Sequence, residues 1–229
     1  SAVAGVCDKL QLTLLRYAQA ASDSPFRDKR LKDVEFAGGV MRLKKNPGTF
    51  IALGAIVERT GRERIEEKYL MLPNVLKQRK FRRLTHSAVF VEVRVDEELG
   101  VVRVTRVVSA IAAGRIMNMK TATSQIIGGV VWGISQALHE ESHTDHRFGR
   151  FMNHNLSEYH VAVNADIHDI DVVFVEEDDR IVSRLGAKGV GEIGLVSVAA
   201  AVSNAIYHAT GKRIRSTPIT PEKVLAGGP

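Results

Sequence analysis

Apolar residues recur at helical intervals along three long stretches of the chain. The spacing is clearest where Ile126, Val130, Ile134 and Leu138 follow one another every four residues, which places them on one face of a helix. The other two stretches mix three- and four-residue steps, with polar residues on the opposite face. The pattern predicts helices over residues 2–20, 120–141 and 194–210.

Alternation of apolar and polar residues marks the expected strands. Residues 88–110 (AVFVEVRVDEELGVVRVTRVVSA) alternate on both sides of a turn at Glu98–Gly100 and predict two paired strands. Residues 34–43 (VEFAGGVMRL) predict a hairpin around their two glycines, and residues 170–176 (IDVVFVE) predict a further strand. Two shorter helices are expected over residues 49–59 and 221–225.

The order of these elements indicates the fold class. Hairpins and helices alternate irregularly along 229 residues, which favours an α+β fold with a mixed β-sheet and packed helices over a doubly wound sheet. The length and a hydrophobic content of 45% are sufficient for one large domain or for two subdomains. Residues 62–86 are charged and weakly periodic, so we expect them to form a long exposed loop.

The net charge of +6 raises the question of an anionic partner. Much of the excess lies in KQRKFRR, residues 77–83, within the expected loop. Such a run could contact nucleic-acid phosphates, with Phe81 stacking on a base. No further aromatic residues or nucleic-acid motif accompany it. We therefore interpret it as a solvated loop that could also dock an acidic protein surface, and we expect no nucleic-acid partner.

The single cysteine and the short apolar runs bear on the compartment. Cys7 has no second cysteine for an internal disulfide, and its place among apolar residues at helical spacing predicts a buried thiol. The longest apolar run, Ile126–Leu138, is too short to cross a bilayer, and no signal peptide opens the chain. We therefore expect no membrane span and a cytoplasmic location, with the periplasm as the alternative.

GAKGVGEIG, residues 186–194, is the strongest candidate for a functional segment. Small residues and glycines surround one carboxylate, Glu192, and glycines allow a backbone to approach a ligand closely. The segment lies where the helix 194–210 is expected to begin, and the first amides of a helix lack partners and favour negative charge. Glu192 at this place suits a base, and the neighbouring amides suit a phosphate or an oxyanion.

The same glycines also spell G-x-G-x-x-G, the fingerprint of dinucleotide-binding units. That fingerprint requires a strand running into the first glycine, Gly189, and an acidic residue about 20 positions later. Polar residues precede the loop here, and Lys212 and Arg213 occupy the later positions. We therefore reject a Rossmann site. A plain turn into a helix, with a solvated glutamate, stays open as an alternative.

Two other strings approach catalytic motifs. Residues 139–143 (HEESH) fit H-E-x-x-H, in which two histidines on one helical face bind zinc. The string falls at the polar end of its expected helix, and His146 is too near to supply a third ligand. Residues 133–137 (GISQA) approach a nucleophile elbow but lie in mid-helix, where the required turn cannot form. We expect neither site, and no metal held by side chains of this chain.

Taken together, several segments resemble the molybdopterin-binding large subunit of the molybdenum hydroxylases, the xanthine dehydrogenase and aldehyde oxidase family. GAKGVGEIG with the following AAAVSNAIYHATGKRIRSTPITPEKVL is similar to the C-terminal part of that subunit. VEVRVDEELGVVRVTRVVSAIAAGRIMN and QIIGGVVWGISQALHEE are similar to its strand pair and its glutamine-bearing helix. FMNHNLSEYHVAVNADIHDIDVVFVE resembles the segment that leads to its glutamate loop. The resemblance covers residues 84–226 in order, and it implies that residues 1–229 form a C-terminal molybdenum-cofactor-binding domain.

The resemblance implies a role for particular residues. In that family a molybdenum-bound hydroxyl attacks an electron-poor carbon, hydride passes to a sulfido ligand, and a glutamate takes the hydroxyl proton; here the glutamate is Glu192. Gln125 occupies the position of a glutamine that contacts the pterin cofactor, and the backbone of Lys188, Gly189 and Val190 supplies further expected contacts. The expected cofactor is molybdenum–molybdopterin in the cytosine dinucleotide form, and the expected substrates are aldehydes or N-heterocycles such as purines.

The sequence also departs from the family pattern. His86-Ser87-Ala88 stands where the family has Phe-Gly-Ala, which puts a backbone contact at Ser87 in doubt. Upstream segments of the large subunit are absent, so we expect this chain to be a fragment or a split half that is inactive alone. Its expected partners are the remaining part of the large subunit, a ferredoxin-like iron–sulfur subunit and an FAD subunit. A non-catalytic binding or assembly module is the competing hypothesis.

Overall fold

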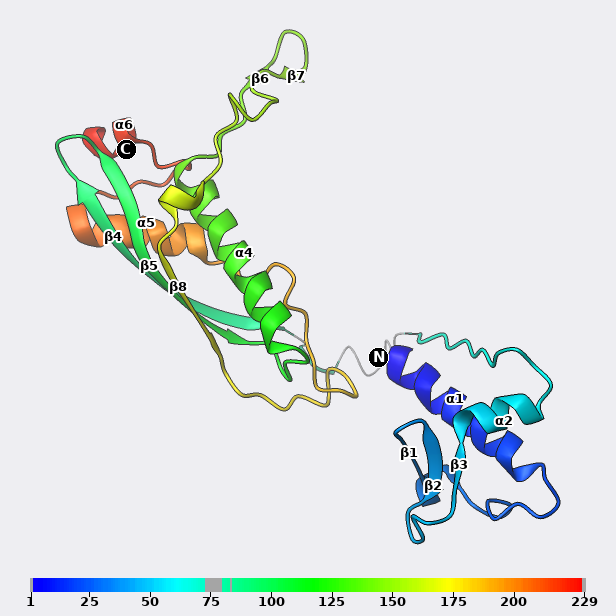
Figure 1. Ribbon diagram of the computed structural model, residues 1–229. Helices are drawn as coiled ribbons and strands as arrows, with labels where there is room; N and C mark the ends of the chain where they lie inside the picture. The colour runs from blue at the N-terminus through cyan, green and yellow to red at the C-terminus, as the bar shows by residue number, and fades with distance from the viewer. Residues whose placement is uncertain (1, 73–79, 83, 228–229) are drawn as a thin grey trace. The chain divides into compact units, whose positions relative to one another are not determined.

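The computed structural model describes residues 2–72, 80–82 and 84–227 (Figure 1). The chain divides into two compact units, Ser1–Arg82 and Arg83–Pro229, and each is described by itself. The length and hydrophobic content of the sequence are compatible with this division into two subdomains. Of the basic run 77–83, residues 77–79 and 83 lie outside the described residues.

The first unit packs two helices and a small antiparallel sheet around one core. Its elements are α1 (Ala2–Gln19), a 3-10 turn (Leu31–Asp33), β1 (Val34–Ala37), β2 (Val40–Leu43), β3 (Phe50–Ala52) and α2 (Leu53–Arg59). The strands pair in the order β1-β2-β3. Gly38 and Gly39 have φ of 57° and 75°, so glycine supplies the left-handed backbone that the expected hairpin requires. Leu15, Met41 and Ile56 are almost completely buried in this core.

Two predictions for the first unit are wrong. Residues 50–52 form the strand β3 rather than the start of a helix, because they pair with β2 from Val40 to Arg42. Cys7 is exposed rather than buried. The buried residues of α1 begin only at Leu14, so the early turns of the helix lie beyond the small core, although their apolar spacing is helical.

The second unit is built on a mixed three-stranded sheet, as the sequence predicts. Its principal elements are β4 (His86–Asp96), β5 (Val101–Ala112), α4 (Met119–Leu138), β8 (Asp169–Phe174), α5 (Val198–Thr210) and α6 (Pro221–Ala226). The order is β4-β5-β8, with β4 antiparallel and β8 parallel to β5. Between α4 and β8 lie the short strands β6 (Thr144–Asp145) and β7 (Arg150–Phe151) and a 3-10 turn (Asn164–Asp166).

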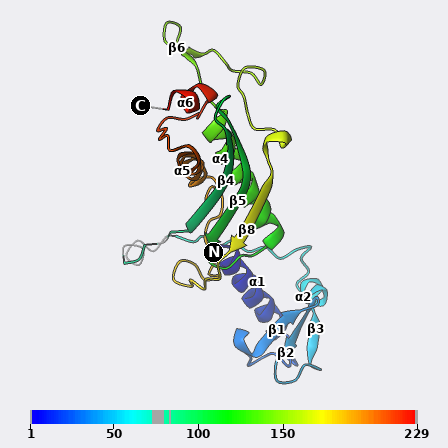
Figure 2. The same cartoon turned by 90° about the vertical axis from the view of Figure 1, so that its left-hand side faces the viewer.

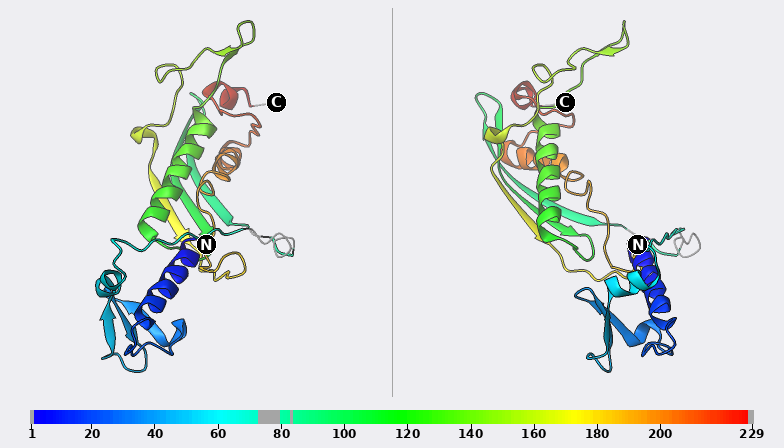
Figure 3. Two further views of the ribbon diagram at one scale, coloured as in Figure 1. Left: turned by 90° about the vertical axis from the view of Figure 1, so that its right-hand side faces the viewer. Right: turned by 45° about the vertical axis from the view of Figure 1, so that its right-hand side comes forward.

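The helices α4 and α5 lie on the same face of this sheet, as two further views make clear (Figures 2 and 3). Val107 and Ile111 of β5, Ile126 and Val130 of α4, and Val202 of α5 are completely buried between them. At about 25 cal/mol per Å² of apolar surface, this layer of aliphatic side chains supplies the main force that holds the helices on the sheet. The predicted packing of both helices is therefore confirmed.

The bounds of both helices differ from the expected ones. α4 ends at Leu138 rather than at residue 141, and α5 begins at Val198 rather than at residue 194. Between Glu192 and Val198 the chain forms successive turns, with Leu195 N–H donating to Glu192 O at 3.0 Å. Glu192 therefore does not lie at the start of a helix, and the macrodipole argument for its charge is wrong.

Residues 62–72 contain no helix or strand, and most are exposed, in line with the expected loop. Part of this segment is nevertheless held, because Thr13 of α1 donates to the carboxylate of Glu67 at 2.6 Å. Lys9 pairs with the same carboxylate at 2.9 Å. The hydrogen bond from Thr13 and the nearby Lys9 lower the pKa of Glu67. Among the described residues, no helix is both long and apolar enough to cross a membrane.

Candidate functional site

The loop 186–194 packs backbone to backbone against α4. A Cβ added to Gly194 would lie 2.8 Å from the carbonyl oxygen of Ile126, and one added to Gly129 would lie 2.9 Å from the backbone of Gly194. One turn later, a Cβ on Gly133 would collide with Val198 at the start of α5. The glycines of α4 thus permit close approach of the loop, and Gly194 is required for packing rather than for a ligand.

Gln125 joins α4 to the same loop through its side chain. Its Nε2 donates to the carbonyl oxygen of Gly191 at 2.6 Å. Gln125 lies on α4 one helical turn before Gly129, so one stretch of helix both packs against the loop and hydrogen-bonds to it. Sixty-six residues separate Gln125 from Gly191 in sequence, and the structure brings these two parts of the predicted site together.

The beginning of the loop is joined to the end of β5. Gly114 forms a bridge with Ala187, and Arg115 N–H donates to Gly186 O at 2.9 Å. Lys188 N–H donates to Ala113 O at 3.0 Å, so this amide has an acceptor within the chain. A Cβ on Gly114 would meet the Gly186 carbonyl, and its φ of 66° also favours glycine.

The side chain of Lys188 forms a nearly enclosed ion-pair cluster. Its ammonium lies 2.5 Å from Glu177 Oε1 and 3.2 Å from Asp179 Oδ2, and the lysine side chain is only 6% exposed. Glu177 also accepts the N–H of Gly114 at 2.9 Å. The hydrogen bond from Lys188 lowers the pKa of both carboxyls, and the bond to Glu177 raises the pKa of Lys188.

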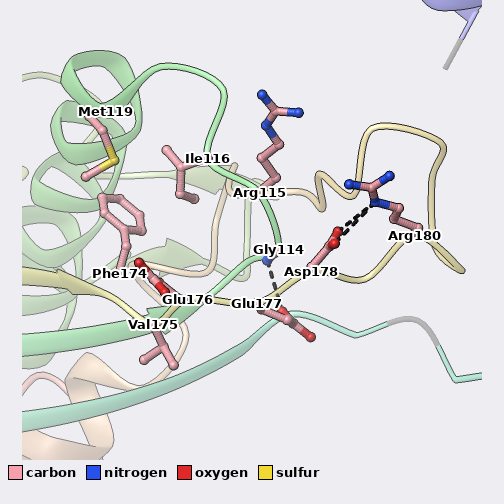
Figure 4. Close-up of a pocket in the computed structure, with 10 residues that line it drawn as sticks. All are labelled: Gly114, Arg115, Ile116, Met119, Phe174, Val175, Glu176, Glu177, Asp178 and Arg180. Atoms are coloured by element: carbon pink, nitrogen blue, oxygen red, sulfur yellow. Dashed lines mark hydrogen bonds and ion pairs between the residues drawn. The ribbon is translucent and has the colours of Figure 1, made fainter.

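A groove of about 410 Å³ opens between the N-terminal part of α4 and the loop. Its lining combines three predicted site residues, Gln125, Lys188 and Val190, with Gly191 and with residues that lead into the helix. The groove adjoins a larger recess of about 710 Å³, because Arg115 and Ile116 line both (Figure 4). In Figure 4 the side chain of Arg115 extends away from the ion pair between Asp178 and Arg180.

Several groups along the groove have no partner within the described part of the chain. The guanidinium of Arg115 forms no ion pair there, and the carboxylate of exposed Glu192 has neither a hydrogen bond nor an ion pair. The amides of Gly189, Val190 and Gly191 likewise have no acceptor among the described residues. A Cβ at Gly189 or Gly191 would meet open space, so packing within this unit does not require glycine at either position.

The predicted residues therefore differ in their surroundings. Gln125 and Val190 face the groove beside Gly191, which was not among the predicted residues. The ammonium of Lys188, by contrast, is engaged with carboxylates and its amide with Ala113. Gly189 uses its carbonyl to accept a hydrogen bond from Thr85 at 2.9 Å. Glu192 follows Gly191 directly in the chain. The sequence departs from the family motif at Ser87. The hydroxyl oxygen of Ser87 lies 3.4 Å from the hydroxyl oxygen of Ser197.

Sequence reasoning missed three residues that shape this site. Glu177 and Asp179 lie in an acidic run that reads as a polar loop, and nothing local indicates that Lys188 lies between them. Arg115 was also missed. It lies in the short connection between an expected strand and an expected helix, and nothing local in the sequence marks it as a cation that faces a groove.

The zinc motif lacks the helical geometry that it requires. α4 ends at Leu138, so His139 is a cap residue and His143 lies outside the helix, directly before β6. The carboxylate of Glu140, which would have to activate water, accepts the Tyr159 hydroxyl at 2.8 Å, and this bond raises the pKa of Tyr159. The two histidines therefore do not share a helical face.

The chain matches the family described as molybdopterin cofactor-binding domain over residues 1–168. It is 48% identical, over 147 residues, to the aldehyde oxidoreductase molybdenum-binding subunit PaoC of Escherichia coli K12. This match covers 64% of the present chain and 20% of PaoC. The chain is also 36% identical, over 135 residues, to the putative xanthine dehydrogenase molybdenum-binding subunit XdhA of the same strain, with 59% and 18% covered.

Solved structures show the same fold within longer chains. Quinoline 2-oxidoreductase from Pseudomonas putida 86 superposes with a TM-score of 0.73 at 22% identity, over 98% of this chain and 28% of the other. The aldehyde oxidoreductase from Desulfovibrio desulfuricans has a TM-score of 0.57 at 32% identity, over 63% and 16%. The present chain thus spans about a fifth of the length of the curated relatives it matches.

Proposed function

Because the chain belongs to the family of molybdopterin cofactor-binding domains, we propose that it forms one wall of a molybdenum hydroxylase active site and supplies the catalytic base, Glu192. The substrates are small aldehydes or N-heterocycles, which gain an oxygen derived from water. The observation that carries this proposal is the 2.6 Å hydrogen bond from Gln125 to Gly191. It joins the helix of the expected cofactor contact to the loop of the expected base.

The groove fits a polar, phosphate-bearing cofactor of the molybdopterin kind. Its volume of about 410 Å³ lies in the range of small-molecule sites, about 300–1,000 Å³. Gly191 leaves open space that a larger side chain would fill. The guanidinium of Arg115, which has no ion pair with any described residue, can bind a phosphate. We assign the cofactor contacts to Gln125, Arg115 and the backbone of Gly189 and Val190, and we propose the cytosine dinucleotide form.

The ammonium and the amide of Lys188 already have partners among the described residues, which limits the expected contact with the cofactor. Because its ammonium and amide are both engaged within the chain, Lys188 acts on the site by holding the loop in place. Its charge is neutralised by two carboxylates, so among the described residues that line the groove Arg115 is the cation that can meet an anionic ligand.

When bound, the cofactor supplies the redox chemistry, and the protein contributes binding, orientation and proton transfer. Glu192 is suited to accept a proton because its carboxylate has no competing donor within the described residues. It follows Gly191, whose carbonyl is held by Gln125, so the position of the base is fixed relative to the cofactor contact. General bases typically contribute a factor of about 10²–10⁴ to the rate.

We further propose that the chain is inactive alone and acts within a complex. One wall of a cofactor site leaves much of the ligand uncovered, and binding must also offset the lost freedom of the ligand. The relatives are named as molybdenum-binding subunits. The iron–sulfur clusters and the FAD are accordingly assigned to partner subunits.

The test is Glu192→Gln, assembled with the remaining subunits. The amide keeps the shape of the side chain but removes the proton acceptor, so turnover per bound molybdenum should fall by about 10²–10⁴ while molybdenum content stays unchanged. Oxidation of aldehydes and N-heterocycles with an artificial electron acceptor measures the turnover. Glu98→Gln, in the exposed β4–β5 turn, is the matched control and should behave as wild type.

Gln125→Ala should have the opposite profile. Loss of the amide removes a proposed cofactor contact and the hydrogen bond to Gly191, so molybdenum content should fall more than activity per bound molybdenum. If Glu192→Gln kept most of its activity per molybdenum, Glu192 would not be the base. The loop would then serve only as a turn that leads into α5.

A further inference from the structure

Among the described residues of the second unit, helices cover the sheet on one face only. The side chains of Val107 and Ile111 face α4 and α5 and are completely buried. On the opposite face Phe90 of β4 is 66% exposed and Val173 of β8 is 50% exposed. Figure 3 shows both helices on one side of the strands, and no described element of this unit packs on the other side.

The strand register gathers the apolar residues of this open face into adjacent rows. Phe90 is paired with Val108, and Ala88 is paired with Ala110, which in turn is paired with Val173. Directly paired side chains on one face of a sheet lie about 4.5–5.5 Å apart at Cβ, so these residues form a continuous patch across all three strands. We call this patch the open face.

Polar and charged residues border the open face, and one ion pair among them joins β5 to β8. Arg106 lies opposite Glu92 in the register and forms an ion pair with Asp171 at 2.6 Å. Glu92 also accepts the hydroxyl of Thr105 at 2.5 Å. The guanidinium of Arg106 is therefore already paired when a surface covers the apolar rows. Exposed Asp169, opposite Arg106 in the register, adds a second carboxylate at this border. An apolar centre with a polar rim is the usual anatomy of a protein interface.

We propose that the open face is the docking surface for the remaining part of the molybdenum-binding subunit. The curated relatives are about five times as long as the segment that matches this chain, so in them most of the subunit lies outside this segment. A contiguous exposed apolar patch on a domain of this kind marks an interaction site. This inference rests on the proposed place of the chain in a larger subunit, and not on the catalytic role of Glu192.

Cysteine accessibility tests the proposal, because Cys7 is the only cysteine. In a Cys7→Ser background, Phe90→Cys reports on the open face. Leu99→Cys reports on the tip of the β4–β5 hairpin, and the two native side chains are matched at 66% and 64% exposure. The rate of maleimide labelling is measured for the chain alone and for the chain co-purified with the remaining part of the subunit. Circular dichroism establishes that each variant folds.

Both variants should label rapidly in the chain alone. In the assembled subunit, labelling of Phe90→Cys should slow by about tenfold or more, which corresponds to about 1.4 kcal/mol or more for exposing the docked face, while Leu99→Cys should be unchanged. An assembly in which Phe90→Cys still labels freely, equal protection at both positions, or no association of the two parts would overturn the proposal.

Protection already present in the chain alone would also overturn it. If this protection increased with the concentration of the chain, the occupant of the open face would be a second copy. If it did not change with concentration, the occupant would be the first unit of the same chain. The outcome is separable from that for the proposed function. A protected but inactive assembly would count against the catalytic assignment, whereas an active assembly with a reactive Phe90→Cys would count against the docking surface.

Discussion

Two segments of the second unit contain a glutamate within a motif-like string. They differ in how firmly the segment is held and in whether the glutamate carboxylate has a partner. The loop 186–194 is held by glycine contacts on α4, by the hydrogen bond from Gln125 and by the Lys188 cluster. The segment 139–143 leaves the end of α4, and the carboxylate that the motif would use, Glu140, accepts a hydrogen bond from Tyr159. The residue types needed for chemistry are present in both, but only the first has both a rigid support and an unengaged carboxylate.

The largest stability effect should come from the support of the loop. Gly194→Ala places a Cβ 2.8 Å from a backbone oxygen of α4, which cannot rotate away, so the substitution should destabilise the chain by about 1–3 kcal/mol. Gly191→Ala is the control within the same loop, because its Cβ meets nothing, and stability should change by less than about 0.5 kcal/mol. Urea denaturation of both variants measures the difference. Equal midpoints would contradict the packing argument.

The next effect should come from the Lys188 cluster. Lys188→Met removes the cation from between Glu177 and Asp179, so the loop should loosen and the amide of residue 188, which donates to Ala113, should exchange hydrogen several-fold faster. Within the assembled enzyme, kcat should fall while cofactor content changes less. The matched comparison is Glu177→Gln alone and with Lys188→Met. If the two substitutions had strictly additive effects on stability, the pair would not be coupled.

The same cluster predicts a dependence on pH. The pKa values of Glu177 and Asp179 are lowered below the ordinary 4.5 and 3.8, so their stabilising contribution is present above these values and is lost as the pH falls through the folded-state values. The pKa of Lys188 is raised above 10.5, so its contribution is lost only at alkaline pH beyond that value.

Stability measured between pH 3 and pH 7 should therefore fall more steeply towards acid in the wild type than in the Lys188→Met variant, because that variant lacks the cation which lowers both carboxyl pKa values. Thermal unfolding at a series of pH values provides the measurement. Parallel curves for the two proteins would argue against a role for the cluster in acid unfolding.

The smallest effects should come from the histidines of the other segment. His143 is exposed and His139 lies outside the helix, so replacing both with alanine should alter stability by less than about 0.5 kcal/mol and leave molybdenum-dependent turnover unchanged. Zinc content before and after treatment with a chelator gives an independent measurement. Stoichiometric zinc that disappears in the double variant would revive the protease motif and weaken the contrast between the two segments.

Local patterns in the sequence were sufficient for most elements. The strands predicted from the alternation in 88–110 and the helix predicted from the four-residue spacing of Ile126 and its neighbours are confirmed. Periodic burial depends on the local backbone, so a local pattern can predict it. Local patterns gave wrong element bounds where contact with a distant strand or helix determined the structure. Residues 50–52 pair with β2, and Gly194 packs on α4, so that α5 begins only at Val198.

The sequence by itself determined the family and the chemical character of the candidate residues, because motif composition does not depend on geometry. Gln125, Glu192 and the glycines of their loop stand out in the primary structure. Only the tertiary structure decided which groups are free to act. It placed the Lys188 ammonium between two carboxylates, left Arg115 unpaired at the groove among the described residues, and joined Gln125 to Gly191. These relations depend on contacts between residues far apart in the chain, and no local pattern encodes them.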